Sequence, residues 1–108
     1  MMPEELFEIL DQLFYTNENV TVQRDVTLAQ IKIPYCIKCY GTSISIFSDN
    51  DTYLQEAQDN LFGEIFVIDP QKDLIENFVI CAALFFKVQN EYTNSLEQVN
   101  KELRKFHM

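Results

Sequence analysis

The sequence has few of the residues on which catalysis most often depends. Its 108 residues include a single histidine, His107, which is the penultimate residue. A serine or cysteine nucleophile needs a neighbouring base, and a chain terminus tends to fray. We therefore interpret His107 as a cation at the end of a helix. The sequence predicts no catalytic residue and no enzymatic activity.

Basic residues are also scarce. Eight Lys and Arg stand against 17 Asp and Glu, which gives a net charge of −9. Phosphate binding requires a basic surface, and the anionic face of a membrane repels an acidic one. We expect neither nucleic acid nor membrane as a partner. The acidity serves either solubility or the binding of a basic protein.

Export and membrane signals are missing as well. The first ten residues contain Glu4, Glu5 and Glu8 where a signal peptide would have basic and apolar residues. The apolar run Phe78–Val88 is shorter than the roughly 20 residues that span a bilayer. Three cysteines, an odd number, indicate reduced thiols. These features predict a cytoplasmic protein.

Cys36 and Cys39 have the spacing of a CxxC motif but lie in strand-like sequence, where their side chains point to opposite faces. A redox site needs its first cysteine at a helix N-terminus. A zinc site built from Cys36, Cys39, Cys81 and His107 would lack the paired spacing of its second half. We expect three buried structural thiols, and no metal or cofactor.

With two glycines, three prolines and 47% hydrophobic residues, the chain is predicted to form one globular domain over residues 1–108. A helical stripe of Leu6, Ile9, Leu10 and Leu13 follows Pro3. Alternating residues predict strands over 20–28, 31–39, 43–47 and 64–69, and a helix is expected over 52–61. Ile31, Ile33, Tyr35, Ile37 and Cys39 should share one strand face, and Pro34 indicates an edge or a bend.

The apolar run Phe78–Val88 fits two structures. It is a fifth strand followed by a helix over 92–106, or it is part of one long helix over 71–106. We favour the strand, because a helix that is apolar on every side needs a core larger than this chain supplies. Leu96, Val99, Leu103 and Phe106 form a stripe on the last helix. In either structure the run should need a second polypeptide to cover it.

The predicted fold class is therefore α+β. We expect an antiparallel sheet of about four to five strands, with an N-terminal, a middle and a C-terminal helix packed on it. The element order is α-β-β-β-α-β-β-α.

This order resembles that of the single-effector (class I) chaperones of bacterial type III secretion. The segments NLFGEIFVID and FVICAALFFKV look like the fourth and fifth strands of that family, QNEYTNSLEQVNKELRKF like its closing helix, and ELFEILDQLF like its first helix. The resemblance implies a cytoplasmic homodimer, linked to virulence, that holds a secreted effector segment extended. It requires the fifth strand.

The resemblance also implies two sets of site residues. The partner-binding set, each member of which could instead be core, is Phe7, Phe14, Tyr15, Ile31, Ile33, Tyr35 and Ile37. The dimer interface, read as one face of the fifth strand, is Phe78, Ile80, Ala82, Leu84 and Phe86.

Two other classes of function remain open. Residues 49–76 contain eight acidic residues and only Lys72 as a base. Such a segment suits a small acidic inhibitor, an immunity or phage anti-defence protein that blocks a basic nuclease or toxin. The same segment is also consistent with a solvated face. The other class is a subunit of a larger assembly with no activity of its own.

Overall fold

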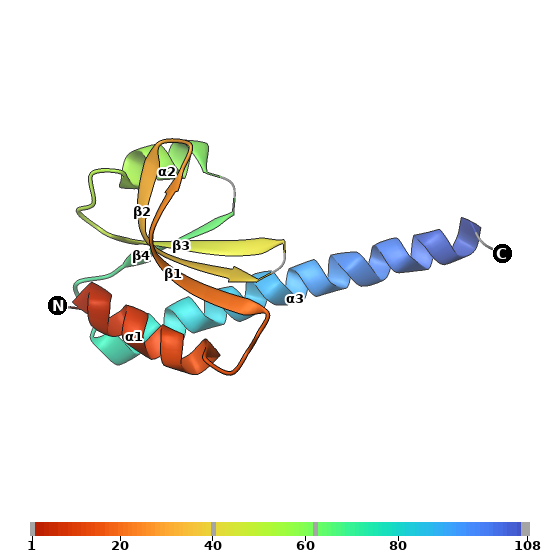
Figure 1. The fold of residues 1–108 in the computed structure, drawn as a ribbon, viewed down its shortest axis with the longest axis horizontal. Helices are drawn as coiled ribbons and strands as arrows, with labels where there is room; N and C mark the ends of the chain where they lie inside the picture. The colour runs from red at the N-terminus through yellow and green to blue at the C-terminus, as the bar shows by residue number, and fades with distance from the viewer. Residues whose placement is uncertain (1, 40, 62, 107–108) are drawn as a thin grey trace.

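The computed structural model describes residues 2–39, 41–61 and 63–106. Along these residues the chain forms three helices and four strands (Figure 1). In chain order they are α1 (Met2–Phe14), β1 (Val20–Leu28), β2 (Ile31–Cys39), β3 (Thr42–Ser48), α2 (Leu54–Asn60), β4 (Glu64–Ile68) and α3 (Leu74–Phe106). The predicted α+β class, with a helix at each end and one in the middle, is confirmed.

The described strands form one sheet in the order β1-β2-β3-β4. The first three are antiparallel neighbours, but β3 and β4 run parallel. Parallel neighbours need a crossover connection, which α2 and its flanking turns supply. The sheet is therefore mixed, whereas the sequence pattern alone predicted an antiparallel one.

Helices cover both faces of the sheet (Figure 1). On one face, α1 and α3 enclose a core cluster that includes Leu6, Leu10, Ile37, Ile44 and Phe85. On the other face, α2 covers a smaller cluster of Ile31, Ile33, Cys36, Phe47 and Ala57. The apolar residues of the central strands are therefore buried from both sides.

The apolar face of β2 changes sides at Pro34. Ile31 and Ile33 belong to the α2-side cluster, whereas Ile37 belongs to the cluster under α1 and α3. The ladder is interrupted at the same place, since pairing skips from Arg24↔Tyr35 to Val26↔Ile33. Asp25, which lies between Arg24 and Val26 on β1, has a left-handed φ of 51°.

The sequence pattern predicted that Ile31, Ile33, Tyr35, Ile37 and Cys39 share one face of β2. This prediction is wrong, because the apolar face changes sides at Pro34. Pro34 has no N–H to give to a neighbour, and an interrupted ladder changes which side chains face the core. The sequence allowed either an edge strand or a bend at Pro34. β2 is an inner strand, and the β1–β2 hairpin curves toward α2 (Figure 1).

Residues 78–88 are helical, so the predicted fifth strand is wrong; within the described residues, this segment lies inside the 33-residue helix α3. The helix is started by local hydrogen bonds, because the Asp73 carboxylate accepts the N–H of Glu76 at 2.8 Å. The sheet then offers one apolar surface to cover one side of the run. Cys81, Ala82 and Phe85 are buried there.

The second half of α3 extends beyond the sheet (Figure 1). Near the end of the sheet, the Gln89 amide nitrogen lies 3.4 Å from the Cys39 sulfur, and the Tyr92 ring lies beside Gly41. A Cβ placed on Gly41 would lie 2.7 Å from the Tyr92 ring, so glycine lets that ring pack on the β2–β3 turn. Residues 93–105 are all exposed. We call residues 93–106 the arm; with it the molecule measures 57 × 29 × 23 Å.

Candidate protein-binding surface

The three cysteines are structural. Cys36 is buried on the α2 side of the sheet, and Cys39 and Cys81 are buried on the other side, as the strand pattern predicted for the CxxC pair. Burial raises the pKa of Cys36, and it raises the pKa of Cys81 to about 12. The Cys36 and Cys81 thiols therefore stay protonated and unreactive at neutral pH. The CxxC spacing therefore carries no redox site.

Among the described residues, no three His, Cys, Asp or Glu side chains are grouped closely enough to hold a metal ion. His107, which the sequence offered as a fourth zinc ligand and as a helix-end cation, lies outside the described residues.

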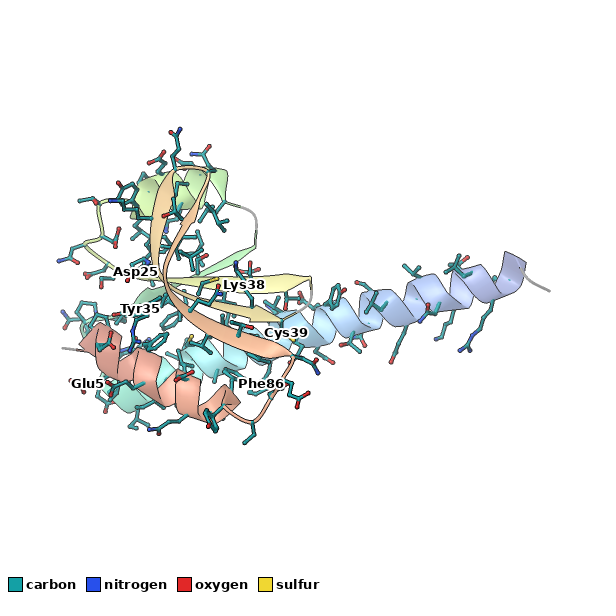
Figure 2. The ribbon with its side chains drawn as sticks, in the orientation of Figure 1. Glu5, Asp25, Tyr35, Lys38, Cys39 and Phe86 are labelled. Atoms are coloured by element: carbon teal, nitrogen blue, oxygen red, sulfur yellow. The ribbon has the colours of Figure 1, made fainter. Side chains whose placement is uncertain are left out.

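The most connected polar cluster joins α1 to the sheet. Glu4 forms an ion pair with Arg24 and accepts a hydrogen bond from the Tyr35 hydroxyl at 2.9 Å. The Arg24 guanidinium lies 4.0 Å from the centre of the Phe7 ring, and this ring is 5.2 Å from that of Tyr35. Figure 2 shows the Tyr35 side chain directed toward α1.

The pKa values follow from these contacts. Hydrogen bonds from Arg24 and then Tyr35 lower the pKa of Glu4, and the Glu4 carboxylate raises the pKa of Arg24. Burial and then the Glu4 carboxylate raise the pKa of Tyr35 to about 12. The three groups bond to one another, and the cluster thereby joins α1 to β1 and β2.

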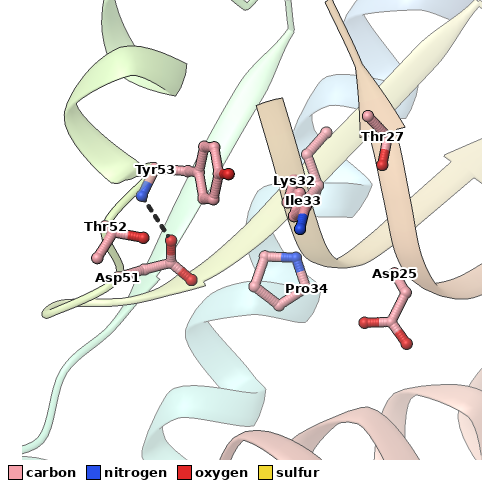
Figure 3. Close-up of a pocket in the computed structure, with 8 residues that line it drawn as sticks. All are labelled: Asp25, Thr27, Lys32, Ile33, Pro34, Asp51, Thr52 and Tyr53. Carbon is pink, nitrogen blue, oxygen red and sulfur yellow. Dashed lines mark hydrogen bonds between the residues drawn. The ribbon is translucent and has the colours of Figure 1, made fainter. Parts of the chain in front are cut away.

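An open hollow of about 470 Å³ lies between the β1–β2 hairpin and the loop before α2 (Figure 3). Asp25 and Asp51 lie on opposite sides of it, and Lys32 and Tyr53 contribute further polar atoms. The Asp51 carboxylate is engaged, since it accepts the N–H of Tyr53 at 2.8 Å. The hydroxyl groups of Thr27 and Thr52 and the apolar side chains of Ile33 and Pro34 complete the lining.

The predicted partner-binding residues are mostly core. Five of the seven are at most 5% exposed, because helices cover both faces of the sheet: Phe7, Phe14, Ile31, Ile33 and Ile37. Tyr35 is half-buried against Glu4, and Tyr15 alone is open, at 84% exposed. All five pack in the core, and Ile33 also lines the hollow of Figure 3.

The predicted dimer-interface residues do not form one surface. They were chosen two apart, as one face of a strand, and on a helix such spacing spreads them around the axis. Ala82 is buried, Phe78 and Leu84 are half-buried, and Ile80 and Phe86 are exposed. The set is corrected because residues 78–88 are helical.

What α3 does expose is an apolar strip on its first half. Ile75, Val79 and Phe86 are 61%, 55% and 51% exposed, and steps of four and seven residues place them on one side of the helix. Phe86 lies at the contact with α1, where its ring is 6.1 Å from that of Phe14. We call these three residues the outer strip. The chain does not cover this side of the run.

The arm exposes a second apolar set. Leu96, Val99 and Leu103 are 46%, 54% and 51% exposed and are spaced by three and four residues. We call them the arm stripe. The sequence pattern predicted this stripe, with Phe106 as a fourth member. It did not place the stripe on the same helix as the apolar run, because it assigned that run to a strand.

No helix within the described residues, α3 included, is both long enough and apolar enough to cross a membrane. No protein-family model matches the chain, and the curated proteins and solved structures compared with it show no similar one.

Proposed function

We propose that this chain is a non-catalytic protein-binding module that uses α3 to bind another polypeptide. The observation that carries the proposal is the uncovered apolar surface of α3 on both the outer strip and the arm stripe. All six side chains are between 46% and 61% exposed, and contiguous exposed apolar residues mark surfaces that bind other proteins. A protein partner would remove that surface from water.

The more specific functions suggested by the sequence receive different support. The resemblance to secretion chaperones required residues 78–88 to be a fifth strand, and that segment is helical. We therefore do not propose a chaperone function. The inhibitor form has one observation in its favour, since Asp49, Glu56 and Asp59 are exposed around α2. An inhibitor of that kind would bind a basic surface through α2, and the binding would weaken with salt.

Site-specific photo-cross-linking in the cells from which the sequence comes tests the proposal. A photoreactive amino acid would replace Val99 in one variant and Phe86 in another. Asn94, exposed on the side of the arm away from the stripe, is the control position. We expect adducts with a polypeptide from position 99 or 86, and at least about tenfold less from position 94, because hot spots cluster in the apolar centre of an interface.

The alternatives give different patterns. A lack of polypeptide adducts from both 86 and 99 would refute the proposal. Adducts only from a photoreactive residue at Glu56, lost at high salt, would favour an acidic inhibitor that acts through α2.

A further inference from the structure

A series of α3 residues, all apolar except Gln89, keeps a single heptad spacing from the body into the arm. The steps alternate between four and three residues. The first members of the series contact the rest of the chain, and the later members lie in the arm. The series is Phe78, Ala82, Phe85, Gln89, Tyr92, Leu96, Val99 and Leu103, and the sequence extends it to Phe106. An average step of 3.5 residues is typical of a coiled-coil seam.

Up to Tyr92 this seam is covered by the chain's own elements. Ala82 and Phe85 are buried, and Tyr92 packs on Gly41. From residue 93 onward the sheet has ended and the same seam is open to water. The arm therefore continues a packing surface that already exists, and it lacks only the opposite helix.

The packed half of α3 nucleates the arm as a helix, but as an isolated helix the arm would be marginal. It has 14 residues, and isolated helices below roughly 12–15 residues are marginal in water. Thr93 and Ser95 bond back to the carbonyls of Gln89 and Glu91, which adds little to helix stability. An opposing helix would supply the missing stabilisation by burying the arm stripe.

We infer that the occupant is the arm of a second copy of this chain, running antiparallel, an inference that rests on the proposed function of α3. Charge supports it. The arm has two acidic and three basic residues, whereas the rest of the chain has fifteen acidic and five basic. Antiparallel arms hold the two acidic bodies at opposite ends, and parallel arms would place them side by side, where they repel.

The order of charges along the arm agrees with this direction. Within the arm, Glu97 lies toward the body, whereas Lys101, Arg104 and Lys105 lie toward the other end, where Glu102 leaves three basic residues against one acidic. Glu91, just before the arm, adds a second acidic residue on the body side. Antiparallel pairing brings the basic end of each arm beside the acidic end of the other. The two arms are thus complementary in charge as well as in their apolar stripe.

The stripe itself also favours antiparallel pairing. Two-stranded parallel coiled coils prefer a β-branched residue at position a and Leu at position d. Here the two a positions of the arm are Leu96 and Leu103, and the d position between them is Val99. In an antiparallel pair a faces d, so Leu96 packs against Val99 of the second copy, and Leu103 extends toward Tyr92 of the second copy.

Light scattering on the full chain tests the dimer. Wild type at tens of micromolar should show twice the chain mass of 12.7 kDa. Val99→Glu should weaken the dimer by at least about tenfold and yield monomer, because a charge is placed in the centre of the interface. The matched control Asn94→Glu adds the same charge on the opposite side of the arm and should stay dimeric.

The orientation is tested by disulfide formation between arms. A Leu96→Cys chain would be mixed with a Val99→Cys chain and oxidised. Antiparallel arms should give mainly the mixed 96–99 disulfide, whereas parallel arms would give 96–96 and 99–99 disulfides and overturn the orientation. The native thiols are buried and should not compete.

A monomeric wild type would overturn the inference. If photo-cross-linking still gave adducts with a different polypeptide, the proposed function would stand without it. A dimer that survives Val99→Glu but dissociates with Phe86→Glu would also overturn it, because the outer strip would then be the interface.

Discussion

Asn77 has no exposed surface, although it is one of the most polar side chains of the core. Its amide nitrogen lies within 3.3 Å of the carbonyl oxygens of Asp69, Lys72 and Asp73, and its amide oxygen accepts the N–H of Asp69 at 2.9 Å. One side chain thereby fixes the turn between β4 and α3. The direction in which α3 leaves the sheet depends on this turn.

Replacing Asn77 should therefore destabilise the fold. Asn77→Ala removes these hydrogen bonds and leaves backbone groups unpaired, which should lower the free energy of unfolding by about 2–3 kcal/mol. Urea denaturation at one fixed protein concentration measures this change. Asn94→Ala, exposed on the same helix, should stay within about 0.5 kcal/mol of wild type. Equal stabilities of the two variants would contradict the role of Asn77.

Tyr35 lies between the sheet and α1, and its pKa is raised to about 12 by burial and by the Glu4 carboxylate. In the unfolded chain the phenol has a pKa near its ordinary value of about 10. As pH rises from about 10 to about 12, the unfolded chain loses this proton before the folded chain does. The contribution of Tyr35 to stability is therefore complete below about pH 10 and is lost as the pH approaches about 12.

Tyr35→Phe should remove this pH dependence. Thermal unfolding of wild type and of the variant would be followed from pH 8 to 12. The gap between the two melting temperatures should be constant at first and should narrow above about pH 10, because only wild type carries the Tyr35 titration. Tyr15→Phe is the matched control, since Tyr15 is 84% exposed. A gap that does not change with pH would contradict the assigned pKa.

At the scale of the element, α3 shows how neighbours decide between strand and helix. The run 78–88 contains residues that favour each structure, including Val79 and Ile80 on one side and Ala82 and Ala83 on the other. An uninterrupted apolar run shows no periodicity, so its sequence does not distinguish a helix from a strand. Two features of the structure favour the helix. One side of it packs on the sheet, and the Asp73 carboxylate caps its first turn.

The two halves of α3 should differ in local stability. In wild type at tens of micromolar, amide hydrogen exchange should be slow over 78–90 and intermediate over 94–104. In Val99→Glu the protection over 94–104 should fall by at least about tenfold, because the arm loses its opposing helix, while that over 78–90 should not change. Unchanged protection of the arm would mean that its helix is stable alone.

At the scale of the whole molecule, acidity and apolar surface are separated. The body carries the negative charge, and the arm is nearly neutral and extends away from it. This separation lets two arms approach without bringing two acidic bodies together. The separation comes from one helix that continues beyond the sheet it packs on.

The sequence by itself determined the elements with a clear period: α1, the strands β1 to β4, the short α2 and the amphipathic end of α3. It also showed that the run near residue 80 has no polar side. These features follow from side-chain spacing, which is local. The excess of acidic over basic residues is likewise a property of composition.

Only the tertiary structure decided which surfaces are covered. It buried Ile31, Ile33 and Ile37 between helices on both sides of the sheet, and it changed the face of β2 at Pro34. It also joined the apolar run and the arm into one helix with a continuous seam. Burial depends on contacts between residues that are distant in sequence, so the spacing of neighbouring residues does not determine which side chains are buried.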